Sequence, residues 1–311
     1  MGDLPPRLTG ADPEGPAGAG EPPRPKRPSH LVPVALGILA GAAAIAVAVV
    51  LVTRGGDSSP ATPAASSAAD PVLRIIFPEG FTREQMAERI ADVNGIARRE
   101  RGVTTALSPE EYLFETKRSS LPKEFGADRR RSLEGFLFPA TYDFTPKTTS
   151  AQLVDLQLDA FRDAWATVDL GYAKKRNLTP YDVLIIASMI QGEVRLPREQ
   201  KLVAAVIYNR LRKDMPLGID ATLRYGLHIP PDESISQSDL ESDNPYNTRR
   251  LKGLPPTPID NPGLAAMEAA AHPANVDYLY YARKKDCKSH FFTADADAFF
   301  AFLDSGKSCP D

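Results

Sequence analysis

The stretch PYDVLIIASMIQGEVRLPREQK, residues 180–201, decides the fold of the region around it. Thr179 comes directly before it and suits the N-cap of a helix, and Pro180 suits the first helical position. Residues 183–190 are apolar on every side of a helix rather than on one stripe. The sequence therefore predicts a helix that is buried all round.

This buried helix ends on a single acid. Gly192 and Pro197 are typical of a helix end, and a second helix is predicted over residues 198–213. Glu193 is then expected at the C-terminal end of the first helix, in the connection to the second.

The position of Glu193 predicts a raised pKa. The last turn of a helix carries the negative end of its dipole, which disfavours a carboxylate, and burial among apolar neighbours acts in the same direction. A carboxyl group that keeps its proton near neutral pH can act as a general acid. The alternative is a solvated loop residue neutralised by Arg195 or Arg198.

Composition argues against one class of protein and predicts a disordered N-terminal tail. The chain has 311 residues, 42% of them hydrophobic, and a formal net charge of −3, which argues against a nucleic-acid binder. Residues 1–30 are rich in Pro and Gly with few large apolar groups, which predicts a disordered tail.

A long uncharged segment follows this tail. Residues 31–53 are long enough to cross the hydrocarbon core of a membrane, and a cleavable signal peptide is the alternative. Arg24, Lys26 and Arg27 come before the segment, so the tail is predicted to be cytoplasmic and the rest of the chain exported. Residues 54–70 are small and polar and predict a flexible linker.

The exported part mixes strand and helix patterns, which predicts an α+β fold. A strand over residues 72–77 leads through a turn to a helix capped by Thr82. A second helix is predicted from Ser108. Further segments are an amphipathic helix from Ser150 whose Leu153, Leu156, Phe161 and Trp165 share a face, and two strands within residues 277–282 and 290–293.

Several longer motifs occur in a fixed order: LEGFLFPATY, ASMIQGE, VAAVIYNRL, LGIDATLRYGL, NPYNTRRLKGLPPTPIDNPG, AAAHPANVDYLYY and HFFT. Together they closely resemble the MltG-type (YceG-like) endolytic murein transglycosylases. The resemblance covers most of residues 72–303 and also the single N-terminal membrane segment. It implies a small LysM-like subdomain over residues 71–131 and a mainly helical catalytic domain over residues 132–311.

The resemblance also implies an activity. Enzymes of this family cut nascent peptidoglycan between N-acetylmuramic acid and N-acetylglucosamine and leave 1,6-anhydromuramoyl ends. The family's acid motif often reads Glu-Lys-Glu, and here it reads Gln191-Gly192-Glu193, so the catalytic role falls on Glu193. That residue would act first as general acid and then as base, without a second carboxylate.

Other matched positions are candidates for substrate binding. Asp220 and Thr222 lie in the GIDAT motif, and a helix N-cap is the alternative for Asp220. Tyr246 and Asn247 match the family's Tyr-Asn-Thr motif, where the Asn247 amide would donate to an acetamido carbonyl, although Pro245 also fits a plain turn. Glu134 is interpreted as supporting the site rather than as reacting.

The remaining chemistry-bearing residues predict no cofactor. Cys287 and Cys309 are predicted to form a disulfide in an oxidising compartment, with two free thiols as the alternative. The histidines have no metal-ligand spacing, so no metal is expected. They are His30, His228, His272 and His290.

The expected partners are peptidoglycan glycan strands and the cytoplasmic membrane, with peptidoglycan synthases as further candidates and no nucleic acid. Two other functions are kept open. One is a conventional muramidase that hydrolyses the bond with Asp220 or Glu134 as second carboxylate. The other is a non-catalytic cell-wall scaffold.

Overall fold

The helix predicted from residues 180–201 lies at the centre of the hydrophobic core. The computed structural model describes residues 70–118, 125, 132–194, 196–230 and 232–309. Helix α5 (Pro180–Glu193) begins at Thr179, which forms a capping box with Asp182. All residues of α5 from Val183 to Ile190 are buried, because α9 and α6 pack against it.

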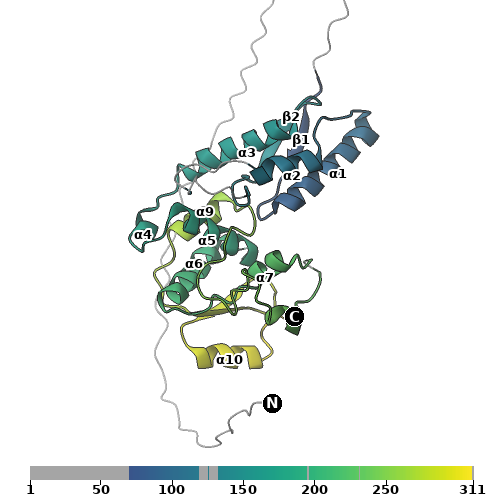
Figure 1. The fold of residues 1–311 in the computed structure, drawn as a ribbon. Coiled ribbons are helices and arrows are strands. Elements are labelled where there is room, and N and C mark those ends of the chain that lie inside the picture. The colour runs from purple at the N-terminus through teal and green to yellow at the C-terminus, as the bar shows by residue number, and fades with distance from the viewer. Residues whose placement is uncertain (1–69, 119–124, 126–131, 195, 231, 310–311) are drawn as a thin grey trace, which may run out of the picture. The chain divides into compact units, whose positions relative to one another are not determined.

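The described part of the chain is mainly helical with two small antiparallel sheets, so the predicted α+β class is confirmed. Figure 1 shows β1, β2 and helices α1 to α3 at one end, α5, α6 and α9 in the middle, and α10 at the other end. The elements are β1 (Leu73–Ile76), α1 (Arg83–Arg101), α2 (Pro109–Arg118), β2 (Thr141–Phe144), α3 (Ser150–Trp165), α4 (Gly171–Lys174), α5 (Pro180–Glu193), α6 (Pro197–Arg212), α7 (Asp220–Leu227), α8 (Gln237–Leu240), α9 (Leu264–Ala271), β3 (Tyr280–Arg283), β4 (His290–Thr293) and α10 (Ala296–Asp304).

The first sheet joins segments far apart in the sequence. Strand β1 pairs antiparallel with β2, with Leu73 opposite Phe144, and α1 and α2 lie between them in the chain. Thr82 caps α1 through a capping box with Gln85, as its sequence predicts. Because the partner of β1 lies beyond residue 131, the predicted boundary between residues 71–131 and 132–311 cuts through this strand–helix–helix–strand unit.

The predicted apolar face of α3 is wrong at one residue. Leu153, Phe161 and Trp165 are buried, but Leu156 is 43% exposed. With about 100° of rotation per residue, the three buried side chains span roughly 120°, and Leu156 lies about 120° from the middle of that arc. Spacing by three residues alone therefore does not place Leu156 in the core.

Three predicted segments lie outside the described residues. They are the tail (1–30), the membrane span (31–53) and the linker (54–70) except for Asp70. Among the residues that the structure describes, no helix is both long and apolar enough to cross a membrane.

Candidate active site

Glu193 is the last residue of α5, and the chain leaves the helix in an extended conformation at Val194. Its side chain is partly buried, and the Tyr281 hydroxyl donates a hydrogen bond to its Oε2 over 3.1 Å. Among the described residues, Glu193 makes no ion pair. Arg198 therefore does not neutralise it, and Arg195 lies outside the described residues.

The surroundings of Glu193 raise its pKa above the usual value of 4.5. Burial is the main cause, as predicted, and the nearby Asp220 carboxylate adds repulsion that the sequence did not predict. The hydrogen bond from Tyr281, the backbone N–H of Ala221 and the charge of Arg283 act against the rise in pKa. Glu193 is thus biased towards its protonated form, while groups that stabilise the anion are already in place.

Asp220 is the first residue of α7 and lies beside Glu193. Its carboxylate pairs with the Arg249 guanidinium, with 2.5 Å between Oδ1 and Nε, and its side chain is 44% exposed. The N-cap interpretation is wrong, because Ile219 occupies the cap position and no side chain caps the helix. The structure therefore brings Asp220 together with Glu193, where it acts on the charge of the acid.

Thr222 and Asn247 lie inside the protein and have no polar group free for a substrate. The Thr222 hydroxyl donates to the Ile219 carbonyl (2.7 Å) and lies 2.9 Å from the Thr248 hydroxyl. The Asn247 amide is fully buried and donates to two backbone carbonyls of the preceding loop, over 3.0 and 2.8 Å. A buried donor needs an internal partner, so both residues hold the loop around α7 rather than offering contacts to a ligand.

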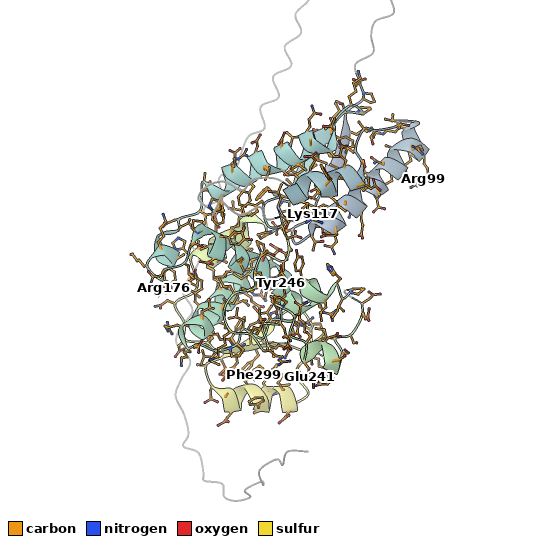
Figure 2. All side chains as sticks on the ribbon, in the orientation of Figure 1. Arg99, Lys117, Arg176, Glu241, Tyr246 and Phe299 are labelled. Atoms are coloured by element: carbon orange, nitrogen blue, oxygen red, sulfur yellow. A yellow bond between two sulfur atoms is a disulfide. The ribbon has the colours of Figure 1, made fainter. Side chains whose placement is uncertain are left out.

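Tyr246 also has a packing role. Its hydroxyl lies 2.7 Å from the Thr257 hydroxyl, and its ring meets the Tyr225 ring edge-on with 5.2 Å between centroids. Figure 2 labels Tyr246 in the middle of the molecule. The residue therefore connects α7 to the Pro-rich loop that follows it.

Glu134 is enclosed by the protein, with only 1% of its surface exposed. Its carboxyl group accepts hydrogen bonds from the Arg83 backbone N–H (3.2 Å), the Asn261 amide (2.9 Å) and the Tyr225 hydroxyl (3.2 Å). Burial raises the pKa of Glu134 from 4.5 to about 8. These contacts join α1, α7 and the Pro-rich loop around Glu134, and its supporting role in the site stays a prediction.

Two cavities border the residues around Glu193. One, of about 360 Å³, is lined by its chain neighbour Gly192, by Ala221 and by Asp260. The other, of about 490 Å³, is lined by Asp220 and by arginines. Arg224 of α7 borders both cavities, and Glu193 itself lines neither. The arginines lining the second cavity are Arg224, Arg249 and Arg283.

Sequence reasoning missed two residues of this site. They are Tyr281, which falls within a predicted strand, and Asp260, which lies in the Pro-rich motif and is not singled out there. Both depend on contacts between distant segments, which no local pattern reports. The one carboxylate within the Pro-rich run 253–263 is the available signal for Asp260.

Gln191 replaces the first acid of the family's usual motif, and it has a structural contact. Its Oε1 accepts a hydrogen bond from the Gly263 backbone N–H over 3.1 Å. This contact ties the end of α5 to the loop that carries Asp260.

The C-terminal region is held by the predicted disulfide. Cys287 and Cys309 are bonded, with 2.04 Å between the sulfur atoms and 5.1 Å between the Cα atoms. Lys284 and Ser308 form an isolated β-bridge beside it. Within the described ranges, no group of three or more His, Cys, Asp or Glu residues could hold a metal ion.

Comparison with known proteins identifies the family. The model of the YceG-like family matches residues 58–302. The chain belongs to the YceG-like family. It is 32% identical over 225 residues to the endolytic murein transglycosylase of Bacillus subtilis (strain 168), which covers 71% of this chain and 62% of that protein. It is 34% identical over 234 residues to the endolytic murein transglycosylase of Streptococcus pneumoniae (strain R6), covering 68% of this chain and 41% of that protein.

The chain therefore spans between about two fifths and three fifths of the length of these relatives. A solved structure of a putative YceG-like protein from Listeria monocytogenes has a similar fold. It matches with a TM-score of 0.62 and 28% identity, over 74% of this chain and 75% of that one.

The pKa of Glu134 predicts how stability depends on pH. Between about pH 4.5 and pH 8 the folded protein keeps a proton that the unfolded chain releases, so stability falls as pH rises through this window. Glu134→Gln keeps most of the hydrogen bonds. It is expected to reduce the fall in the free energy of unfolding across this pH window by an amount on the order of a few kcal/mol. Urea unfolding at a series of pH values measures it.

The exposed Glu88 offers a matched control, since Glu88→Gln should keep the wild-type pH dependence of the unfolding free energy. Identical pH profiles for wild type and Glu134→Gln would show that Glu134 is ionised in the folded protein.

Proposed function

We propose that this protein is an endolytic peptidoglycan lytic transglycosylase that cleaves between N-acetylmuramic acid and N-acetylglucosamine and leaves 1,6-anhydromuramoyl ends. The observation that carries the proposal is one carboxyl group, Glu193, with a raised pKa, whose neighbours Gly192 and Asp220 each line a cavity. Membership of the YceG-like family, with relatives named endolytic murein transglycosylase, supports it.

In the first step, protonated Glu193 donates its proton to the glycosidic oxygen. The bond from that oxygen to C1 of the muramoyl residue breaks, and N-acetylglucosamine leaves with a free 4-hydroxyl. Positive charge develops at C1, where the acetamido group of the same sugar can stabilise it, as in substrate-assisted glycosidases.

In the second step, the Glu193 carboxylate takes the proton of the muramoyl 6-hydroxyl while that oxygen bonds to C1. The acid is restored to its starting state and no water is consumed. The carboxylate formed between the two steps accepts hydrogen bonds from Tyr281 and from the Ala221 backbone N–H. These two donors favour proton release, whereas burial and Asp220 favour proton retention.

The surroundings of Asp220 and Glu134, the two acids considered as the second carboxylate, argue against a conventional muramidase. Such an enzyme needs a second carboxylate free to attack C1 or to activate water. Asp220 is paired with Arg249, and Glu134 is enclosed by three donors. A mechanism with one acid fits these constraints better.

The products formed in heavy-oxygen water test the function. The wild-type protein is expected to release anhydro-ended fragments without incorporating the label, and Glu193→Gln should lower their formation by at least about 100-fold, the lower range of general acid–base catalysis. Mass spectrometry of digested peptidoglycan measures both. Asp220→Asn serves as control, since it removes a neighbouring carboxylate and should still give anhydro ends.

Two results would contradict the proposal. Labelled reducing ends from the wild-type protein would indicate a muramidase. Full function of Glu193→Gln in cells, with no anhydro ends from the wild type, would indicate a cell-wall scaffold that recruits peptidoglycan synthases.

We also propose that the unit from β1 to β2 is LysM-like and binds glycan. Its order, a strand at each end with two helices between, supports this, as does a cavity between β1 and α1 that is bordered by the exposed Ile96. Ile96→Glu should reduce retention of the protein on insoluble peptidoglycan several-fold. Leu156→Glu, an equally exposed site outside this cavity, should not, and equal retention of both variants would favour a spacer role.

We further propose that residues 31–53 anchor the protein in the cytoplasmic membrane with the catalytic part outside. The apolar sequence, the basic residues before it and the disulfide near the C-terminus support this. Protease added to intact spheroplasts should digest the region after residue 70. Protection of that region until the membrane is lysed would contradict this orientation.

A further inference from the structure

Asp260 is a buried acid without a hydrogen-bond partner for one of its oxygens. Only 4% of the residue is exposed, and Oδ1 has no partner among the described residues. Burying an unpaired polar group costs stability, so such a group in a native structure calls for an explanation. Asp260 lines the cavity beside Gly192.

Gly192 keeps the approach to Asp260 open. A Cβ atom at this position would lie 3.4 Å from Asp260 Oδ2 and 3.2 Å from the Ala221 Cβ. Any larger side chain would fill the space between the acid and the start of α7. Ala221 lines the same cavity and its backbone N–H hydrogen-bonds Glu193, so the cavity lies close to the proposed catalytic acid, although Glu193 itself does not line it.

The walls of this cavity combine apolar and polar groups. Ala221 and Ile259 provide apolar surface close to Asp260, and Thr82 and Tyr225 border the same space. Its volume of about 360 Å³ lies within the range of small-ligand sites. Other polar side chains, including Glu84 and Arg224, also line the cavity. The apolar wall directly beside the Asp260 carboxyl group suits a ligand that carries a methyl group next to a hydrogen-bonding group.

We propose that this cavity is an N-acetylhexosamine subsite, in which the Asp260 carboxyl group hydrogen-bonds the acetamido group of a sugar bound next to Glu193. The acetamido group has an N–H donor, a carbonyl acceptor and a methyl group, which match the carboxyl group and the apolar wall. The choice of an acetamido sugar rests on the proposed function. Rotation about the terminal side-chain torsion of Asp260 allows either oxygen to face the ligand.

The protonation state of Asp260 is compatible with a neutral ligand. Burial raises the pKa of Asp260 well above its usual value of 3.8, and the electrostatic interaction with Glu134 raises it further. A neutral carboxyl group can donate to the acetamido oxygen or accept from its N–H without leaving an unpaired charge in the cavity.

Binding of an N-acetylglucosamine tetramer to the full chain, measured by calorimetry, tests the subsite without depending on cleavage. Asp260→Leu is expected to weaken binding roughly tenfold, as for the loss of one buried hydrogen bond. Asp260→Asn should stay within about threefold of wild type, since an amide can make the same contacts. Asp260→Leu should not lower the unfolding midpoint, because it removes an unpaired buried group.

Ser242→Ala is the matched control. It also removes a buried oxygen without a partner in the described residues, but Ser242 does not line this cavity. Its affinity for the tetramer should equal that of wild type. Cellotetraose, which lacks acetamido groups, should bind the wild-type protein roughly tenfold more weakly and should bind Asp260→Leu no more weakly than wild type.

Unchanged affinity of Asp260→Leu for the tetramer would overturn the inference, and so would a wild-type protein that does not bind the tetramer. An Asp260→Leu variant whose affinities for the tetramer and for cellotetraose fall by the same factor would also overturn it. If Asp260→Leu does not fold, saturation-transfer NMR of the tetramer bound to the wild-type protein tests the inference instead. Absence of saturation transfer to the acetamido methyl groups of the tetramer would overturn it. The two proposals fail separately. If the wild-type protein forms anhydro ends and Asp260→Leu binds the tetramer as tightly as wild type, only the subsite is rejected. If Asp260→Leu binds the tetramer more weakly but the wild-type protein forms no anhydro ends, only the transglycosylase function is rejected.

Discussion

The side chain of Asn261 holds together the segments on which the site depends. Its Oδ1 accepts from the backbone N–H groups of Gly135 and Leu137, and its Nδ2 donates to the Phe81 carbonyl and to Glu134, all over 2.9 Å. The amide is fully buried and uses its full hydrogen-bonding capacity. Three segments distant in the sequence are thereby fixed, and the loop that carries Asp260 is one of them. A substitution here would leave buried groups unpaired on each of those segments.

The chemistry of Glu193 depends on a balance between opposing effects that this framework maintains. Burial and the Asp220 carboxylate favour the protonated acid, and Tyr281 with the Ala221 N–H stabilises the anion. A general acid that later acts as base has to be able to hold its proton and to release it. The Arg249 partner of Asp220 keeps that second carboxylate in place and occupied. One reacting acid, controlled by neighbours that do not react, accounts for the arrangement.

Local patterns predicted β1, α1, α2, α3, α5, α6, β3 and β4, because capping residues and apolar runs act over a few positions, whereas β2, α4, α9 and α10 are not among the predicted elements. The buried α5 and its Thr179 cap follow from such signals. Side-chain direction was harder to predict. Matching a family motif suggested that Asn247 contacts substrate, whereas its amide faces backbone carbonyls. Asp260 and Tyr281 reach the site from distant loops and strands, so only the tertiary fold reveals their roles.

The most direct test of the account is a carbon-13 NMR titration of the Glu193 carboxyl group, assigned by its loss in Glu193→Gln. The account predicts a pKa above the usual 4.5 in wild type. Asp220→Asn should lower that pKa, because it removes a repulsive charge, and Tyr281→Phe should raise it, because it removes a donor to the anion. A wild-type pKa at or below the usual value would contradict the central claim that the surroundings of Glu193 raise its pKa.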